Sequence, residues 1–402
     1  MTRTRLLGIG LGVLALVVSA SPATAEEIEV TPPMTWTVTG HGWGHGHGMS
    51  QYGALEAARQ GVGWKQILGF YYPGTRLGRT HGNLKVLITA DNKDVMVDAR
   101  EGLRLRPLSG HKEFVLAKLR PKATRWRILP KGEKSVVQFK LGGGGWARWT
   151  AFPGPAEFSA GHQPITLRLP GRVTADYRGV LRSVEKHTVN VLPLDRYVQG
   201  VVPRESPASW PADALRAQAV AARTYAAYER ANATTYYDIC DTTACQVYAG
   251  AGAEDPATDA AVRATRGRVV TYEREPAFTQ FSSSNGGWSS AGSQPYLVAQ
   301  PDPYDAASGN PNASWKATLT SQQIERKWPQ IGALSHISLT RDGHGDYGGR
   351  VTAATFTGSA GSVTVSGDDV RYLMGDAGKS TWFQLTPVPS RGARTWTPDL
   401  GL

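Results

Sequence analysis

The sequence predicts an α+β fold: a larger β-rich domain that contains one Ala-rich helix, with a small β domain inserted in it or flanking it. Three observations support this class. The 402 residues include 46 Gly and 25 Pro, which divide a chain into short elements. β-favouring runs bounded by Gly, Pro or charge recur at residues 85–89, 136–141, 165–169 and 188–192. One helical face repeats at spacings of 4, 3 and 4, formed by Leu215, Ala219, Ala222 and Ala226.

The first 25 residues have the pattern of an export signal. Arg3 and Arg5 precede an apolar run at residues 6–18, and Ala23-Thr24-Ala25 is a small-x-small cleavage pattern. A retained membrane anchor is the alternative interpretation. The apolar run is short for a bilayer span, however, and no later stretch is long enough for a membrane helix. We therefore expect a secreted, extracellular chain that begins near Glu26 and opens with a flexible lead-in over residues 26–35.

The elements are expected in the following order. Residues 55–68 fit an amphipathic helix interrupted at Gly61 and Gly63, and residues 84–202 are strand-like, with a hairpin or strand junction at the four glycines 142–145. The Ala-rich helix runs from Pro211 to about Arg230 with Ser209 as its N-cap. A short helix at 259–265, strands near Val269 and at 278–281, and a β-rich C-terminal third follow.

These elements suggest five parts. They are a signal peptide (1–25), a segment with a Gly/His motif that packs on the main domain (26–80), a β-rich subdomain (81–172), the main domain (173–390) and a C-terminal tail (391–402).

The chain is basic, with 44 Lys and Arg against 33 Asp and Glu and a formal charge of +11. Loss of Arg3 and Arg5 with the signal leaves 42 − 33, or +9. Outside the cell this charge favours acidic glycans, teichoic-type polymers or membrane surfaces as partners and disfavours nucleic acid. Because the basic residues are scattered along the sequence, charge alone identifies no site.

Cys240 and Cys245 are the two cysteines of the sequence. In an exported protein we expect them to form a disulfide that closes one short surface loop. Metal ligation is the alternative, although no His lies close to them in the sequence.

Glu205 is an acidic residue among apolar and Pro residues just before the Ala-rich helix. A carboxyl group in a partly dry pocket has a raised pKa, which suits a general acid near neutral pH. The structural alternative is an ion pair with Arg204, Arg216 or Arg223.

A second segment, residues 41–53, alternates glycine with His and Trp: His41, Trp43, His45 and His47 are each followed by Gly. Glycine lets the backbone approach a ligand closely. Three His in seven residues suggest zinc, but the glycines exclude a regular helix and no Glu lies in the run. A polar, aromatic loop that binds sugar or backbone is the favoured interpretation.

The third segment, residues 281–288, contains Ser283, Ser284 and Asn285 followed by two glycines. It is either a turn between strands or a loop that lines a cleft and binds sugar hydroxyls. A serine hydrolase would need a G-x-S-x-G elbow, which this run lacks.

Together these segments resemble the SpoIID family (the SpoIID/LytB domain) of peptidoglycan lytic transglycosylases. The resemblance covers about half the expected mature chain, through Tyr177-Arg178-Gly179, residues 189–197, 200–205 and 214–225, Ser283 to Gly287, and the Gly-x-Gly-His-Gly-x-Gly-Met-Ser-Gln-x-Gly pattern of the Gly/His loop.

The resemblance implies roles for individual residues. Glu205 matches the catalytic acid and Arg223 an arginine important for activity, expected to hold a substrate carboxylate or acetamide. His45, Ser50 and Gln51 fall in the Gly/His motif. We expect these three, with Ser283, Ser284 and Asn285, to bind substrate, and Trp43, Trp210 or Trp288 to stack on sugars. No cofactor or metal is expected.

Two departures from the family pattern have consequences. The family commonly has the Gly/His motif after the catalytic helix, whereas here it comes first, and residues 367–371 and 379–383 resemble the segment that usually precedes it. The domain therefore looks circularly permuted, which predicts that residues 36–50 lie beside the strand containing Phe383. Where relatives often read Cys-Asp-Thr-Thr-His-Cys, this chain has Ala244, which favours the disulfide over a zinc site.

The function implied is lytic transglycosylation of the MurNAc–GlcNAc β-1,4 bond, with 1,6-anhydro-MurNAc ends, on glycan poor in stem peptides. A second hypothesis is a non-catalytic wall module that recruits or stimulates an amidase. A third is a zinc hydrolase built on His41, His45 and His47.

Overall fold

The computed structural model describes residues 25–306 and 309–389, so the expected cleavage signal and the tail from residue 390 lie outside the described residues. Strands and helices mix throughout, which confirms the α+β class. The chain forms two compact units. Within the described residues the first holds 25–38, 317–376 and 381–389, and the second holds 39–306, 309–316 and 377–380. This division differs from the expected one, because residues 317–376 separate from the Ala-rich helix and join the lead-in.

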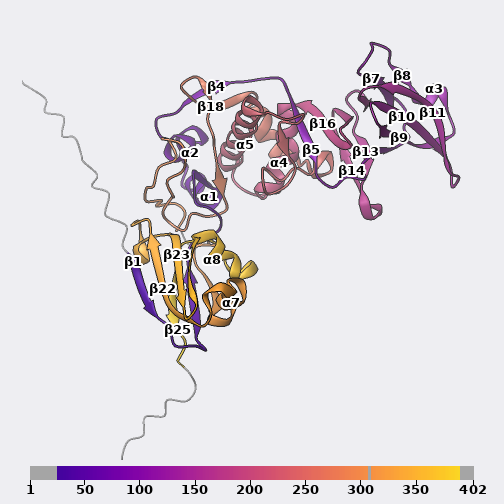
Figure 1. Ribbon diagram of the computed structural model, residues 1–402. Coiled ribbons are helices and arrows are strands. Elements are labelled where there is room, and N and C mark those ends of the chain that lie inside the picture. The colour runs from indigo at the N-terminus through magenta and orange to yellow at the C-terminus, as the bar shows by residue number, and fades with distance from the viewer. Residues whose placement is uncertain (1–24, 307–308, 390–402) are drawn as a thin grey trace, which may run out of the picture. The chain divides into compact units, whose positions relative to one another are not determined.

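The first unit contains a four-stranded antiparallel sheet and a three-stranded sheet with two short helices (Figure 1). The first sheet has the order β1 (Ala25–Glu29), β22 (Leu334–Arg341), β23 (Val351–Gly358), β24 (Gly361–Ser366). The second has the order β21 (Trp315–Thr320), β2 (Thr35–Gly40), β25 (Phe383–Pro387). The helices are α7 (Ser321–Lys327) and α8 (Gly367–Leu373).

The lead-in was expected to be flexible, but its first part is the strand β1, which pairs with β22 along its whole length. Its charged side chains contribute to this pairing, because buried Arg341 forms an ion pair with Glu26 at 2.6 Å. The strand β2 lies between β21 and β25. The expectation that the segment from residue 36 lies beside the strand of Phe383 is therefore confirmed for β2, and circular permutation stays a prediction.

The second unit contains the remaining sheets. A seven-stranded sheet has the order β17 (Ile239–Cys240), β5 (Asn83–Ile88), β16 (His187–Pro193), β15 (Val180–Val184), β12 (Ala156–Ser159), β7 (Arg104–Pro107), β8 (Phe114–Val115). A six-stranded sheet has the order β11 (Trp146–Pro153), β10 (Lys134–Leu141), β9 (Ala123–Lys131), β6 (Val95–Asp98), β13 (Ile165–Arg168), β14 (Thr174–Tyr177). Two small sheets are β19 (Glu275–Pro276), β18 (Arg268–Tyr272), β4 (Arg76–Arg79), and β20 (Phe281–Ser282) with β3 (Met49–Ser50).

These strands include all four predicted runs, as β5, β10, β13 and β16, and β10 and β11 form a hairpin across the four glycines. The strands from β6 to β15 are inserted between β5 and β16, which pair with each other. The predicted β-rich subdomain is thus an insertion whose apolar side chains continue the core of the unit.

Six helices complete the described part of this unit: α1 (Gln51–Arg59), α2 (Trp64–Tyr71), α3 (Leu116–Leu119), α4 (Leu194–Glu205), α5 (Ala212–Asn232) and α6 (Pro256–Ala264). The chain breaks between α1 and α2 near Gly61 and Gly63, as expected. The Ala-rich helix is α5, and its N-cap is Pro211 rather than the expected Ser209. Its alanines between residues 214 and 227 are buried, which allows the close approach to α4 seen in Figure 1.

Among the described residues, no helix combines the length and the apolar character needed to cross a lipid bilayer.

Candidate active site

Glu205 is the last residue of α4, a helix that the sequence reading missed. Pro193 and Pro203 bracket this segment and made it resemble an irregular connection. The segment is nevertheless helical, because a helix lets Leu194, Val198 and Val201 pack into the core of the second unit. Ser206 then turns to an extended conformation. The helix therefore presents the Glu205 carboxyl at its C-terminal end, next to the start of α5.

Two donors from distant parts of the sequence hold the Glu205 carboxyl. Gln51 Nε2 donates to Oε2 at 3.2 Å, and the backbone N–H of Val247 donates to Oε1 at 3.2 Å. Burial raises the pKa of Glu205, and this effect exceeds the lowering by the two hydrogen bonds and by the charge of Arg204. A half-buried carboxyl with a raised pKa has the protonation behaviour that general acid chemistry requires.

The alternative of an ion pair for Glu205 is wrong for the part of the chain that the structure describes. Arg216 pairs with Asp213 at 3.1 Å and Arg223 with Asp195 at 2.7 Å.

Gln51 reaches Glu205 because the Gly/His loop leads directly into α1. Ser50 is the N-cap of this helix, and its Oγ accepts from the Gly53 N–H at 3.0 Å. Gln51 is therefore the first helical residue, and only 7 % of it is exposed. The motif thus contributes a buried amide beside the carboxyl rather than an exposed ligand.

The Gly/His loop and the Ser/Asn/Gly loop, residues 281–287, lie against each other. The N–H groups of Trp43 and Ser284 each donate to the carbonyl oxygen of the other residue, at 2.8 and 3.1 Å. Gly48 has φ +64°, and a Cβ there would meet the Gln280 carbonyl oxygen at 2.2 Å. Glycine is required at this position by both the backbone conformation and the close approach.

The three histidines of the loop make different polar contacts, and the rings of His45 and His47 stack with their centroids 5.0 Å apart. His41 Nδ1 lies 3.0 Å from the Ala313 carbonyl oxygen, and His47 Nδ1 lies 3.2 Å from that of Ser290. His45 Nδ1 accepts from the His47 N–H at 2.9 Å. No group of three His, Cys, Asp or Glu side chains with metal-binding geometry exists among the described residues. The zinc hydrolase hypothesis therefore lacks a ligand cluster in this part of the chain.

The expected sugar-binding roles of Ser50, Ser284 and Asn285 do not fit their positions, because all three side chains are fully buried. Ser284 Oγ donates to Asp305 Oδ2 at 2.8 Å, and Asn285 Nδ2 donates to Asp302 Oδ2 at 2.7 Å. These polar groups hold the two loops together. Ser283 is half-buried, and its Oγ accepts from Asn312 Nδ2 at 3.1 Å.

Asp302 and Asp305 are functional candidates that the sequence reading missed. Asp305 accepts hydrogen bonds from Ser50 Oγ and Ser284 Oγ, and from the Gly286 N–H at 2.5 Å. Burial and the charge of Asp305 raise the pKa of Asp302 to about 6. Their spacing in Pro301-Asp302-Pro303-Tyr304-Asp305 resembles an ordinary turn, so the sequence gives no signal of their burial. Through Ser50, Asp305 fixes the start of the helix that carries Gln51.

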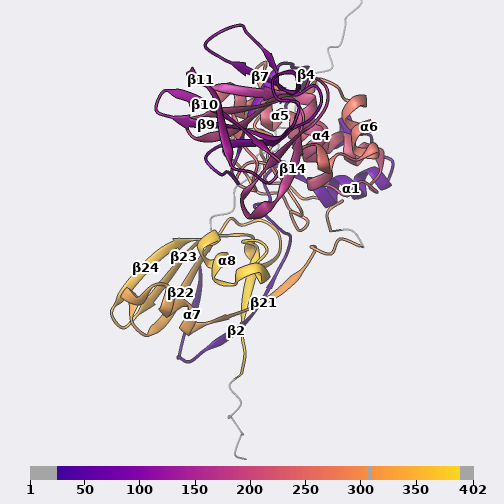
Figure 2. The same ribbon diagram turned by 90° about the vertical axis from the view of Figure 1, so that its right-hand side faces the viewer.

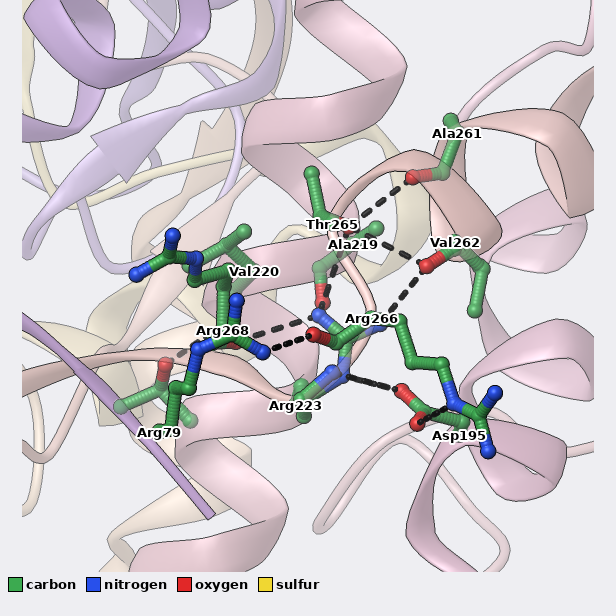
Figure 3. Close-up of polar contacts among 12 residues, drawn as sticks. Arg79, Asp195, Ala219, Val220, Arg223, Ala261, Val262, Thr265, Arg266 and Arg268 are labelled. Carbon is green, nitrogen blue, oxygen red and sulfur yellow. Dashed lines mark hydrogen bonds and ion pairs between the residues drawn. The ribbon is translucent and has the colours of Figure 1, made fainter. Parts of the chain in front are cut away.

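Arg223 is fully buried in the middle of α5, so its expected contact with substrate does not fit the structure. Figure 3 shows its guanidinium enclosed by Asp195 and by backbone carbonyls. Nε donates to Asp195 at 2.7 Å, and the carbonyl oxygens of Ala219, Val262 and Arg268 accept from the terminal nitrogens at 3.2–3.3 Å. Arg223 thus ties α5 to α4, α6 and β18.

The cysteines form the expected disulfide between Cys240 and Cys245. The short loop that it closes precedes Val247, the backbone donor to Glu205. Gln246, between them, accepts from Tyr197 Oη on α4 at 3.1 Å. The loop is therefore attached to the helix that ends at Glu205.

Aromatic side chains flank these groups. Trp210 and Tyr52, which are close in sequence to Glu205 and Gln51, form an edge-to-face pair with ring centroids 5.4 Å apart. Trp43 is 46 % exposed, with Lys379 Nζ 4.9 Å from its ring centroid. Trp288 forms a backbone bridge with Pro301. Exposed or half-buried Trp rings are suited to stack on sugar faces.

The fold and site define a domain in which a single half-buried Glu at a helix end meets a Gly/His loop. Residues 183–272 match the family model described as "SpoIID: Stage II sporulation protein". This match identifies residues 183–272 as a SpoIID domain.

Curated relatives support this placement. The chain is 31% identical over 230 residues to the Stage II sporulation protein D of Bacillus subtilis, covering 50% of this chain and 61% of that protein. It is 40% identical over 136 residues to the Amidase enhancer of the same organism, covering 32% of this chain and 18% of the relative. The Stage II sporulation protein D of Bacillus amyloliquefaciens is 33% identical over 146 residues, covering 30% of this chain and 42% of that protein. The chain spans less than two thirds of each of these relatives.

Proposed function

We propose that this protein is an exported lytic transglycosylase that cleaves the MurNAc–GlcNAc bond of peptidoglycan, on strands poor in stem peptides. The observation that carries the proposal is the Glu205 carboxyl, which burial keeps at a raised pKa while two donors fix both of its oxygens. The SpoIID domain supports a role at the cell wall.

One carboxyl group suffices for the proposed reaction. Protonated Glu205 gives its proton to the glycosidic oxygen as the bond from C1 breaks. The resulting carboxylate takes the proton of the 6-hydroxyl as that oxygen attacks C1, so the glycan ends in a 1,6-anhydro ring and Glu205 is protonated again. No water is consumed, and the attack is intramolecular, which supplies the rate advantage of proximity.

The two buried acids that join the Gly/His and Ser/Asn/Gly loops are consistent with the single-carboxyl mechanism. A hydrolase that inverts or retains configuration needs a second carboxylate exposed to the sugar. Asp302 and Asp305 are at most 2 % exposed, and their oxygens accept hydrogen bonds from the surrounding loops. They are placed to hold the site together rather than to activate a water molecule.

The test is mass spectrometry of the products released from purified glycan strands. We expect anhydro ends, and Glu205→Gln should lower the rate by about 10²- to 10⁴-fold, the contribution of a positioned general acid. Glu229→Gln is the matched control, because burial also raises the pKa of that carboxyl but it lies on α5, hydrogen-bonded to Tyr225. Hydrated reducing ends, or full activity of Glu205→Gln, would refute the proposal.

A second candidate is a non-catalytic module that recruits or stimulates an amidase, which the similarity to the Amidase enhancer favours. It predicts that the purified chain releases no glycan fragments and that Glu205→Gln leaves amidase stimulation unchanged. Product analysis without and with an added amidase distinguishes the two candidates.

A further inference from the structure

The positive charge of the protein is concentrated in the inserted β subdomain. Residues 95–184 contain 17 Lys and Arg against 6 Asp and Glu, a formal charge of +11, which equals that of the whole chain. The remaining residues are balanced, with 27 of each sign. The basic residues that seemed scattered along the sequence therefore belong mostly to one folded insertion. Residues 95–182 also lie outside the match to the SpoIID family model.

Strand register places many of these charges on one face of the six-stranded sheet. Trp126, Ile128 and Phe139 are buried, so their neighbours in β9 and β10 point to the opposite face. That outer face contains Arg125, Arg127, Lys131, Lys134, Lys140, Arg148 and Arg168, together with Trp146. Figure 2 shows β9, β10 and β11 side by side.

Acidic side chains neutralise some of the basic residues on this face, whereas the positive charge of the others is not neutralised. Asp98 pairs with Arg125 and Arg168, and Asp94 pairs with Arg127. Among the residues with described positions, Lys131, Lys134, Lys140 and Arg148 form no ion pair, and Glu133 in the turn is the nearest acid in sequence. We define these four residues as the ribbon cations, because all lie on the β9–β10–β11 ribbon.

The ribbon cations form two pairs, one near each end of β10. Lys131 and Lys134 face each other where β9 meets β10, and Lys140 and Arg148 lie near the other end of β10. Six residues of strand separate Lys134 from Lys140, or about 20 Å at the usual rise. Trp146 is opposite Lys140, and the Arg127 guanidinium lies 4.4 Å from its ring centroid. A linear polyanion about 20 Å long can contact both pairs, whereas a membrane would contact only the tip with exposed Leu141.

We propose that the outer face of the β9–β10–β11 ribbon binds a linear polymer of repeating phosphodiesters, which would hold the protein at an anionic cell wall. The repeat supplies one negative charge per unit, so several consecutive units can contact both pairs of cations. The binding is independent of the chemistry at Glu205. It would raise the local concentration of the active site on the wall.

The test is calorimetric titration of the chain from residue 26 with poly(glycerol phosphate) at several NaCl concentrations. We expect Kd to rise with salt, as for binding driven by release of counterions. Replacing the four ribbon cations by Gln should weaken binding at least about tenfold and reduce the slope of log Kd against log salt by about 2 to 3.

The matched control removes the same charge elsewhere, by Lys65→Gln, Arg274→Gln, Lys316→Gln and Lys327→Gln, and should change Kd less than about twofold. Equal weakening by both variants, or a wild-type Kd insensitive to salt, would overturn the proposal. Tighter binding of anionic lipid vesicles or duplex DNA than of poly(glycerol phosphate) would overturn the assigned partner. Glycan stripped of anionic polymers should be cleaved equally by the ribbon variant and wild type, which separates this proposal from the proposed function.

Discussion

The Glu205 carboxyl is balanced between two opposing influences. Burial favours its protonated form, while the donors from Gln51 and Val247 favour its carboxylate. The proposed mechanism needs both forms in one catalytic cycle, so a site that stabilises only one would be slow. Substitution of Gln51 can test how the two influences set the pKa of Glu205, because its side chain donates a hydrogen bond to the carboxyl.

We predict that Gln51→Leu shifts the alkaline limit of activity to higher pH. Activity needs protonated Glu205, and it falls as pH rises through the raised pKa of that group. Loss of a donor to the carboxylate raises this pKa further, so the falling limb of kcat/KM moves upward in pH. The measurement is a pH–rate profile on glycan strands. Gln60→Leu, at the exposed end of α1, is the control. If the falling limb of the profile stays at the same pH or moves to lower pH, the proposed role of Gln51 is contradicted.

At the scale of elements, the site depends on how α5 packs against α4 and α6. Small buried alanines let α5 approach its neighbours, and Arg223 fills the remaining space with polar bonds to Asp195 and to three carbonyls. The pKa of Arg223 is lowered by burial, and Asp195 opposes this effect. A charged group in this position stabilises the helix assembly only while its partners remain in place.

We predict that Arg223→Gln acts on stability rather than on substrate binding. Breaking a buried ion pair costs about 3 to 5 kcal/mol of unfolding free energy. Urea unfolding measures this loss, and KM of the protein that remains folded should stay near the wild-type value. Arg216→Gln is the control on the same helix, because its pair with Asp213 is half exposed and should contribute under about 1 kcal/mol. Near wild-type stability with a tenfold higher KM would instead assign Arg223 to the substrate.

At the scale of the whole molecule, the Asp302–Asp305 pair joins segments far apart in the chain. Asp302 accepts from Tyr71 Oη on α2 at 2.8 Å and from Asn285, while Asp305 bonds to Ser50. A buried pair of acids makes the stability of the second unit depend on pH, because one of them holds a proton more tightly when folded.

We predict that the stability contribution of Asp302 is lost between pH 4 and pH 6. Its folded pKa is raised from 3.8 to about 6, so the contribution is fully present below the lower value and disappears as pH rises through the upper one. The change in unfolding free energy is up to about 3 kcal/mol. Thermal unfolding of wild type and Asp302→Asn across this range measures it, and the variant should lack the decline. Asp376→Asn, at an exposed position, should retain it. Parallel declines in wild type and Asp302→Asn would contradict the prediction.

Local patterns predicted much of the secondary structure, and they indicated Glu205 as the candidate acid. The four strand runs, the glycine break between α1 and α2, the Ala-rich helix and the disulfide all depend on residues close in sequence. The helix α4 was missed because Pro193 before it and Pro203 within it outweigh its apolar periodicity in a local reading. The lead-in strand β1 was missed because its stability comes from pairing with β22, more than 300 residues later.

The sequence by itself determined the position of the candidate acid, since Glu205 stands before the Ala-rich helix in a segment that resembles a family motif. Only the tertiary structure decided what surrounds it: Gln51 and Val247 as donors, Arg223 and Asn285 as buried supports, and Asp302 and Asp305 as the hidden pair. Charge, burial and hydrogen-bond geometry are properties of neighbours in space. A linear sequence specifies them only after folding has brought distant segments into contact.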